Sequence, residues 1–149
     1  MYTNRLSIKI ALVLSLSIIL LAACGATAEP TVVGTWTSTV TKEDVLRVMP
    51  DFHQEALCEN TGTFVWQFNA DGTFAVDQTA IPECPVPDNP HIEDTWSIEG
   101  NQITFAKGTP FEEVYEWTVE GNTLVMKHIS GECIPCQAAN TANPWTQVE

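Results

Sequence analysis

Apolar and polar residues alternate along three stretches of the chain, and a short polar sequence interrupts each stretch near its middle. The stretches cover residues 64–78, 94–107 and 115–128, and each contains a tryptophan in its first half. Alternation with a period of two predicts β-strands that bury one face. The interrupting sequences, Asn-Ala-Asp-Gly once and Gly-Asn twice, favour tight turns between paired strands. We therefore predict three β-hairpins.

The turns also predict which residues face each other across each hairpin. In all three hairpins this pairing collects large apolar side chains on one face, as expected for an antiparallel sheet with one buried side. The predicted pairs in the first hairpin are Phe64–Gln78, Trp66–Val76 and Phe68–Phe74. The predicted pairs in the second are Asp94–Lys107, Trp96–Phe105 and Ile98–Ile103. The predicted pairs in the third are Tyr115–His128, Glu116–Lys127, Trp117–Met126 and Val119–Leu124.

Two further strands and one helix complete the pattern. Residues 33–40 and 143–148 are rich in β-forming side chains, and the pattern over residues 41–49 predicts a short capped helix that Pro50 ends. We predict an all-β fold, an eight-stranded antiparallel up-and-down barrel with one short helix between the first two strands. The three tight turns then share one end of the barrel, the base. The longer connections share the other end, the rim: residues 41–62, 79–92, 108–111 and 130–142.

Two short motifs resemble those of bacterial lipocalin-like lipoproteins, which are calycin-type barrels. One is Gly34-Thr35-Trp36 in the first strand, and the other is the run from Trp66 to Phe74 that contains Asn-Ala-Asp-Gly. The resemblance covers about residues 32–149 and implies the barrel fold. Gln147 stands where such barrels often carry an arginine that packs on the first tryptophan, so we expect different packing at the closed end.

The N-terminus has the pattern of an export signal. Arg5 and Lys9 precede an apolar run, which ends in Leu21-Ala22-Ala23-Cys24. This ending resembles the lipobox of bacterial lipoproteins, which implies cleavage before Cys24 and a lipid on its sulfur; ordinary cleavage near Ala28 is the alternative. We predict a lipoprotein signal peptide over 1–23, a lipidated tether over 24–31 and the barrel domain over 32–149. The protein would lie in the cell envelope, anchored by its lipid and facing the extracytoplasmic side.

The charge of the mature chain narrows the choice of partners. After cleavage before Cys24 it keeps 19 acidic but only four basic residues, a net charge of about −15. Such a chain could not neutralise phosphates, which argues against nucleic acid and against anionic membrane surfaces. The expected contact with the membrane is therefore through the N-terminal lipid only.

The four remaining cysteines all map to the rim. Exported chains with an even number of cysteines favour disulfides. Cys58 and Cys84 would face each other if the pairing of the first hairpin extended that far. Cys133 and Cys136 would then form a disulfide with each other or remain a dithiol.

Two sharper interpretations of the Cys133–Cys136 pair stay open. A zinc site could combine cysteine thiolates with His53, His91 or His128, all of them at the rim end. Redox exchange would need a helix N-terminus to stabilise the thiolate, and residues 137–140 are a poor helix start in an all-β chain. We therefore favour a structural disulfide and predict no metal and no cofactor.

The inward faces of the predicted strands suggest a ligand site in the lumen. Its floor and walls would be apolar, polar side chains near the rim would orient a head group, and residues 41–57 would form a lid. The predicted lumen residues are Trp66, Trp96, Phe105, Lys107, Tyr115, Trp117 and His128. No catalytic constellation stands out, so we expect a binding protein for a small apolar or amphipathic ligand and not an enzyme. The alternative is a filled barrel whose rim loops bind or inhibit a protein, such as a basic hydrolase.

Overall fold

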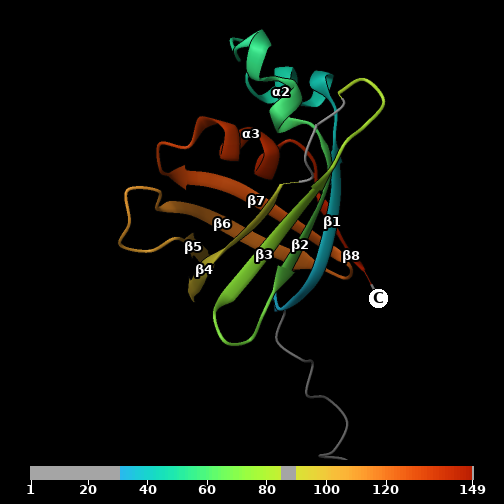
Figure 1. Ribbon diagram of the computed structural model, residues 1–149. Coiled ribbons are helices and arrows are strands. Elements are labelled where there is room, and N and C mark those ends of the chain that lie inside the picture. The colour runs from blue at the N-terminus through green and yellow to red at the C-terminus, as the bar shows by residue number, and fades with distance from the viewer. Residues whose placement is uncertain (1–30, 85–89, 149) are drawn as a thin grey trace, which may run out of the picture.

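The computed structural model describes residues 31–84 and 90–148, which form a closed antiparallel barrel (Figure 1). Each strand pairs with the next in the chain, and β8 returns to pair with β1. The strands are β1 (Gly34–Val40), β2 (Gly62–Phe68), β3 (Thr73–Thr79), β4 (His91–Glu99), β5 (Gln102–Phe105), β6 (Glu113–Glu120), β7 (Thr123–Ser130) and β8 (Trp145–Val148). The predicted fold class is confirmed, including the short helix α2 (Lys42–Val48) after the first strand.

The hairpin registers agree with the sequence prediction except at one pair. Trp66 faces Val76, Trp96 faces Phe105 and Tyr115 faces His128, as the turns require. The predicted pair of Asp94 with Lys107 is wrong, because β5 ends at Phe105. Ala106 has a φ of +50°, and its N–H bonds to the Thr95 carbonyl, so the chain leaves the ladder before Lys107. The Lys107 ammonium instead lies outside the barrel, 2.7 Å from a carboxylate oxygen of Glu99.

A second helix, α3 (Ile134–Thr141), covers residues 137–140, which the sequence analysis treats as a poor helix start; the helix begins three residues earlier, at Ile134. Cys133 caps α3, because its sulfur accepts a hydrogen bond from the Cys136 N–H, and Pro135 fits the first turn. Ala138 and Ala139 bury the inner face of α3 against the core. The helix therefore depends on packing at the rim, which local propensity does not report.

The two ends of the barrel are built differently. Tight turns join the strands at the base, whereas α2, α3 and the 3₁₀ helices η1 (Gln54–Ala56) and η2 (Cys58–Asn60) gather at the rim (Figure 1). There α3 contacts α2, η2 and strand β7. The helical cover also enters the core, since Val45 of α2 and Leu57 between η1 and η2 are buried.

The lumen between base and rim is packed with aromatic side chains. The Trp66 ring lies at its centre, stacked on Phe74 with ring centroids 5.2 Å apart. It also meets Phe105 at 5.0 Å and Trp145 at 5.5 Å, both edge to face. Offset and edge-to-face contacts of this kind add to the hydrophobic burial of the rings. This aromatic cluster forms the main core of the barrel.

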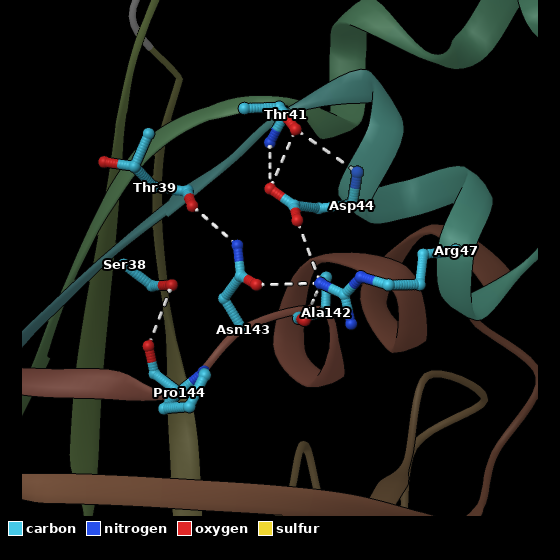
Figure 2. A network of polar contacts seen from close by, with 8 residues as sticks. All are labelled: Ser38, Thr39, Thr41, Asp44, Arg47, Ala142, Asn143 and Pro144. Atoms are coloured by element: carbon cyan, nitrogen blue, oxygen red, sulfur yellow. Dashed lines mark hydrogen bonds and ion pairs between the residues drawn. The ribbon is translucent and has the colours of Figure 1, made fainter.

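A set of polar contacts fastens α2 to the segment between α3 and β8 (Figure 2). Thr41 and Asp44 form a capping box at the start of α2. Arg47 donates to the Asp44 carboxylate, to the carbonyl of Ala142 at 2.7 Å and to the side-chain oxygen of Asn143. Asn143 in turn donates to the Thr39 carbonyl on β1. Helix α2 is thereby tied to the C-terminal end of α3 and, through Asn143, to strand β1.

The predictions for the N-terminus concern residues outside those described. The signal peptide over 1–23, Cys24 and the tether up to residue 30 all fall there. Within residues 31–84 and 90–148, no helix is both long and apolar enough to cross a membrane.

Candidate functional site at the barrel rim

The structure brings together some of the predicted lumen residues and separates others. Trp66 and Phe105 belong to the aromatic cluster, and a chain of ring contacts continues from Phe105 to Tyr115 at 5.7 Å and from Tyr115 to His128 at 5.4 Å. Trp117 packs beside this core. Its indole N–H is buried and finds no partner among the described residues.

Trp96 packs against the aromatic core near the base, whereas Lys107 lies outside the core. Trp96 contacts Phe68, and its indole N–H donates to the carbonyls of Asn69 and Thr73 at a base turn. Lys107 pairs with Glu99 on the outer surface, so its ammonium does not face the lumen.

A buried polar cluster, which sequence analysis missed as a unit, lies between the aromatic core and α3. We call it the Glu113 cluster, and its members are Glu113, Tyr115, His128 and Asn140. The Tyr115 hydroxyl donates to Glu113 Oε2 at 3.2 Å and accepts from the Asn140 amide at 3.1 Å. His128 Nε2 lies 3.3 Å from the same Glu113 oxygen, without the geometry of a hydrogen bond. Glu113 Oε1 accepts from the backbone N–H of Cys133 at 2.6 Å.

Local backbone features place Glu113 inside. It shares the inward face of β6 with Tyr115, so the sequence did carry the signal of a lone acid on an apolar face. The register shifts by one residue after the pair of Tyr115 and His128, which leaves Ile129 as an exposed bulge residue. Gly131 then passes over the Glu113 carboxylate with a φ of +131°, and a side chain at that position would collide with the carboxylate.

Burial is the main reason why the pKa of Tyr115 is raised. The hydrogen bond from Asn140 opposes this effect, while the charge of Glu113 and the hydrogen bond to it add to it. The phenol therefore stays neutral at physiological pH and serves as a donor to the carboxylate. The Glu113 carboxylate and the Tyr115 hydroxyl thus have hydrogen-bond partners inside the barrel, whereas the buried His128 Nε2 has none among the described residues.

Both predicted disulfides are confirmed, and their settings differ. Cys58–Cys84 joins η2 to the connection after β3 across 26 residues, and Cys84 is fully buried. Cys133–Cys136 spans three residues at the first turn of α3, where both cysteines are partly exposed. The second disulfide therefore lies between solvent and the Glu113 cluster.

A groove of about 470 Å³ opens beside this disulfide. One wall is the segment after α2, and the other is the pair of residues between the two cysteines, Ile134 and Pro135. The lining is mostly apolar and includes two polar side chains: Met49, Pro50, Asp51, Phe52, His53, Ala56, Ile134 and Pro135. The sequence predicts a lid for residues 41–57, and no pattern in that segment indicates a groove.

The histidines considered for a zinc site do not meet at the rim. His53 lines the groove, His91 bonds to Asp77 on the sheet surface, and His128 belongs to the Glu113 cluster. Across the described ranges, no three His, Cys, Asp or Glu side chains are grouped as metal ligands.

Comparisons with known protein families, with curated proteins and with solved structures find no significant match. The barrel agrees with the lipocalin-like fold that the sequence motifs imply, and that fold is compatible with ligand binding.

Proposed function

We propose that this protein is a lipid-anchored, extracytoplasmic barrel that binds a small apolar or amphipathic molecule at its rim. The observation that carries the proposal is the groove between the segment after α2 and the first turn of α3. Its volume and its mostly apolar lining are those of a small-molecule site. Asp51 and His53 would interact with the polar group of an amphipathic ligand.

The packing of the lumen favours the groove over the lumen as the binding site. Trp66, Phe105 and Tyr115 are buried and in ring contact with their neighbours. A ligand inside the barrel would have to displace these rings and lose their packing energy. A ligand in the groove displaces only solvent, because the groove is already open.

The groove can be tested with two matched substitutions. Ile134 in the groove and Ile92 on β4 are each 56% exposed, so a glutamate at either position adds one charge to the surface. We expect Ile134→Glu to weaken binding of the fluorescent probe N-phenyl-1-naphthylamine roughly tenfold, because it places a charge against the apolar ligand. Ile92→Glu should bind the probe like the wild type. Equal affinities in all three proteins would overturn the groove as the site.

Lipid anchoring rests on the sequence around Cys24 and is tested separately. In a bacterial host, the full chain should fractionate with membranes, and its mature N-terminal peptide should carry acyl chains in mass spectrometry. Cys24→Ser should remove the acyl chains and leave the two disulfides formed. A Cys24→Ser protein that still carries acyl chains would contradict the proposed anchor.

A second candidate function follows from charge. Asp51, Glu55 and Glu132 are exposed on the groove lining, on η1 and just before α3, within a strongly acidic chain. This surface favours a basic protein partner, such as a cationic hydrolase, through electrostatic steering. Binding to lysozyme that falls steeply with ionic strength and is weakened by Glu55→Lys would support this candidate. Lysozyme activity and mobility unchanged by the protein at low salt would exclude it for this hydrolase.

A further inference from the structure

The Cys133–Cys136 disulfide has the surroundings of a reactive bond. Cys133 occupies the N-cap of α3, where its sulfur accepts a hydrogen bond from the Cys136 N–H at 3.3 Å. Backbone N–H groups at a helix N-terminus stabilise negative charge, so a thiolate at Cys133 would be stabilised here. Both cysteines are partly exposed, and the groove wall formed by Ile134 and Pro135 lies between them in the sequence.

The fold does not depend on this disulfide to hold α3 in place. Asn140 donates to Tyr115, and its carbonyl accepts from the buried indole of Trp145. Ala138 is buried as well, so the helix is anchored along its inner face. The bond also joins residues only three positions apart in the sequence, and the stabilisation expected from a disulfide becomes smaller as the loop that it closes becomes shorter. The bond can therefore open and leave α3 in position.

The buried carboxylate of Glu113 is an observation independent of the helix N-terminus. It accepts from the Cys133 N–H at 2.6 Å and is itself held by Tyr115, beside His128 and under Gly131. A structural disulfide has no need of a buried acid with a tyrosine and a histidine beside it. In an exchanging pair, the Glu113 carboxylate would have two roles. It would hold the backbone of Cys133 in place, and its charge would change the stability of the neighbouring thiolate.

We propose that Cys133–Cys136 is a thiol–disulfide exchange site that passes oxidation state to and from the cysteines of another polypeptide, while Cys58–Cys84 is a permanent structural bond. The proposal does not require the groove to hold a small ligand. It gives the chain a chemical activity in addition to binding.

The exchange balances without any further reagent. In the reduced protein the Cys133 thiolate attacks one sulfur of a partner's disulfide, a mixed disulfide forms, and the partner's second sulfur leaves as a thiolate that takes up a proton. Cys136 then loses its proton and attacks the Cys133 sulfur, which releases the partner's first thiolate. The partner disulfide becomes a dithiol and this pair becomes a disulfide. The reverse sequence oxidises a partner dithiol. Glu113 is a positioning residue in both directions.

The chain contains its own control for the test. Cleavage at lysine and arginine places Cys58 and Cys84 in peptide 48–107, and Cys133 and Cys136 in peptide 128–149. The full chain, produced with its own leader and kept in its membranes, is equilibrated in glutathione buffers of graded ratio, quenched with acid and alkylated. Mass spectrometry then reports the oxidation of each pair separately.

We expect peptide 128–149 to become reduced under buffers in which peptide 48–107 stays oxidised, with equilibrium constants at least roughly a hundredfold apart, or about 60 mV. Equal constants, or easier reduction of Cys58–Cys84, would overturn the proposal. This comparison needs no variant.

Two sets of variants test the roles of individual residues. Cys133 in Cys136→Ser should react with glutathione disulfide faster than Cys136 does in Cys133→Ser, because only Cys133 caps the helix. Glu113→Gln keeps an acceptor for the Cys133 N–H but removes the charge, so the equilibrium should shift severalfold toward the dithiol. If Glu113 had only a structural role, Glu113→Gln would change the free energy of unfolding and leave the disulfide–dithiol equilibrium constant of Cys133–Cys136 unchanged. Unchanged constants in Glu113→Gln and equal rates in the two serine variants would remove these assignments.

Discussion

The base and the rim are formed by the same eight strands but differ in the contacts that hold them together. At the base, tight turns close an aromatic core in which Trp66 contacts four other rings. At the rim, helices cover the lumen, and polar contacts, disulfides and a groove open to solvent accompany the buried side chains of Val45, Leu57 and Ala138. The base has little beyond packing, whereas the rim carries the Glu113 cluster, two disulfides and the groove. The closed sheet thus encloses a packed aromatic core and carries the polar and covalent features at its rim.

The largest expected effect comes from the aromatic core. Trp66→Ala should lower the free energy of unfolding by about 3–5 kcal/mol, because it removes the ring that joins Phe74, Phe105 and Trp145. Phe111, which is 76% exposed near the rim, is the control, and Phe111→Ala should change stability by less than about 0.5 kcal/mol. Urea unfolding followed by circular dichroism gives both values. Similar small effects would mean that the lumen is loosely filled, and would return it to consideration as a ligand site.

The second prediction concerns the glycine that covers the buried acid at the rim. Gly131→Ala should cost on the order of 2–4 kcal/mol, because the new methyl group would collide with the Glu113 carboxylate and the φ is unfavourable for alanine. Gly121 at a base turn also has a positive φ but open space around it, so Gly121→Ala should cost only about 1 kcal/mol. Urea unfolding of the two variants compares the ends directly. Equal costs would show that backbone strain alone matters and that the carboxylate can move away.

The third prediction tests the polar fastening of α2. Partial burial raises the pKa of Asp44, but hydrogen bonds from Arg47, from Thr41 and from Asn143 outweigh it and hold the pKa well below its usual value. Asp44→Ala should therefore cost about 1 kcal/mol at pH 7, as loss of a helix cap does. Since the folded-state pKa is the lower one, this contribution exists above about pH 4 and is lost as the pH falls further. Urea unfolding at pH 7 and pH 3 should show the difference from wild type shrinking.

Glu43 is the matched control for that measurement. It is the exposed acid next to Asp44, in the first turn of the same helix. Glu43→Ala should change stability by less than about 0.5 kcal/mol at either pH. A pH-independent cost at Asp44 would indicate that its role is packing and not charge.

Most of the base could be predicted from the sequence, because it depends on local rules. A Gly-Asn or Asp-Gly turn sets the register of a hairpin, and the register then sets which tryptophans face inward. Extending the register of the first hairpin also predicted the pairing of Cys58 with Cys84. It failed at β5, where Ala106 leaves the ladder early, and at Ile98, which was expected to face inward and is 36% exposed.

The rim could be predicted only in part, because its structure depends on contacts between distant segments. Helix α3 has weak local signals, and it forms through its cap at Cys133 and the burial of Ala138. Alternation along β6 places Glu113 on the same face as Tyr115, but its partner Cys133 lies 20 residues away in the sequence. The groove depends on how the segment after α2 meets α3, which hydrophobic patterning does not encode.

The smallest expected effect is on the pKa of His91, and it compares an exposed ion pair on the outer surface near the rim with the more buried Glu113 cluster. His91 on β4 faces Asp77 on β3 at 2.7 Å, and its side chain is half exposed, unlike the more buried pair of His128 and Glu113. Hydrogen bonds to Asp77 and then Glu93 raise the pKa of His91 above its usual value. The pair therefore stabilises the fold below about pH 6.5, and this contribution disappears as the pH rises through the folded-state pKa.

An NMR titration of His91 measures this effect directly. Asp77→Asn should remove most of the rise in pKa, and so should high salt, because exposed charges are screened. The same substitution at Asp94, which bonds to its neighbour Thr95 instead, should leave the titration of His91 unchanged. If salt had no influence, the His91–Asp77 pair would be shielded from solvent like the Glu113 cluster. The exposed sheet surface and the buried polar cluster at the rim would then not differ in how solvent screens their charges.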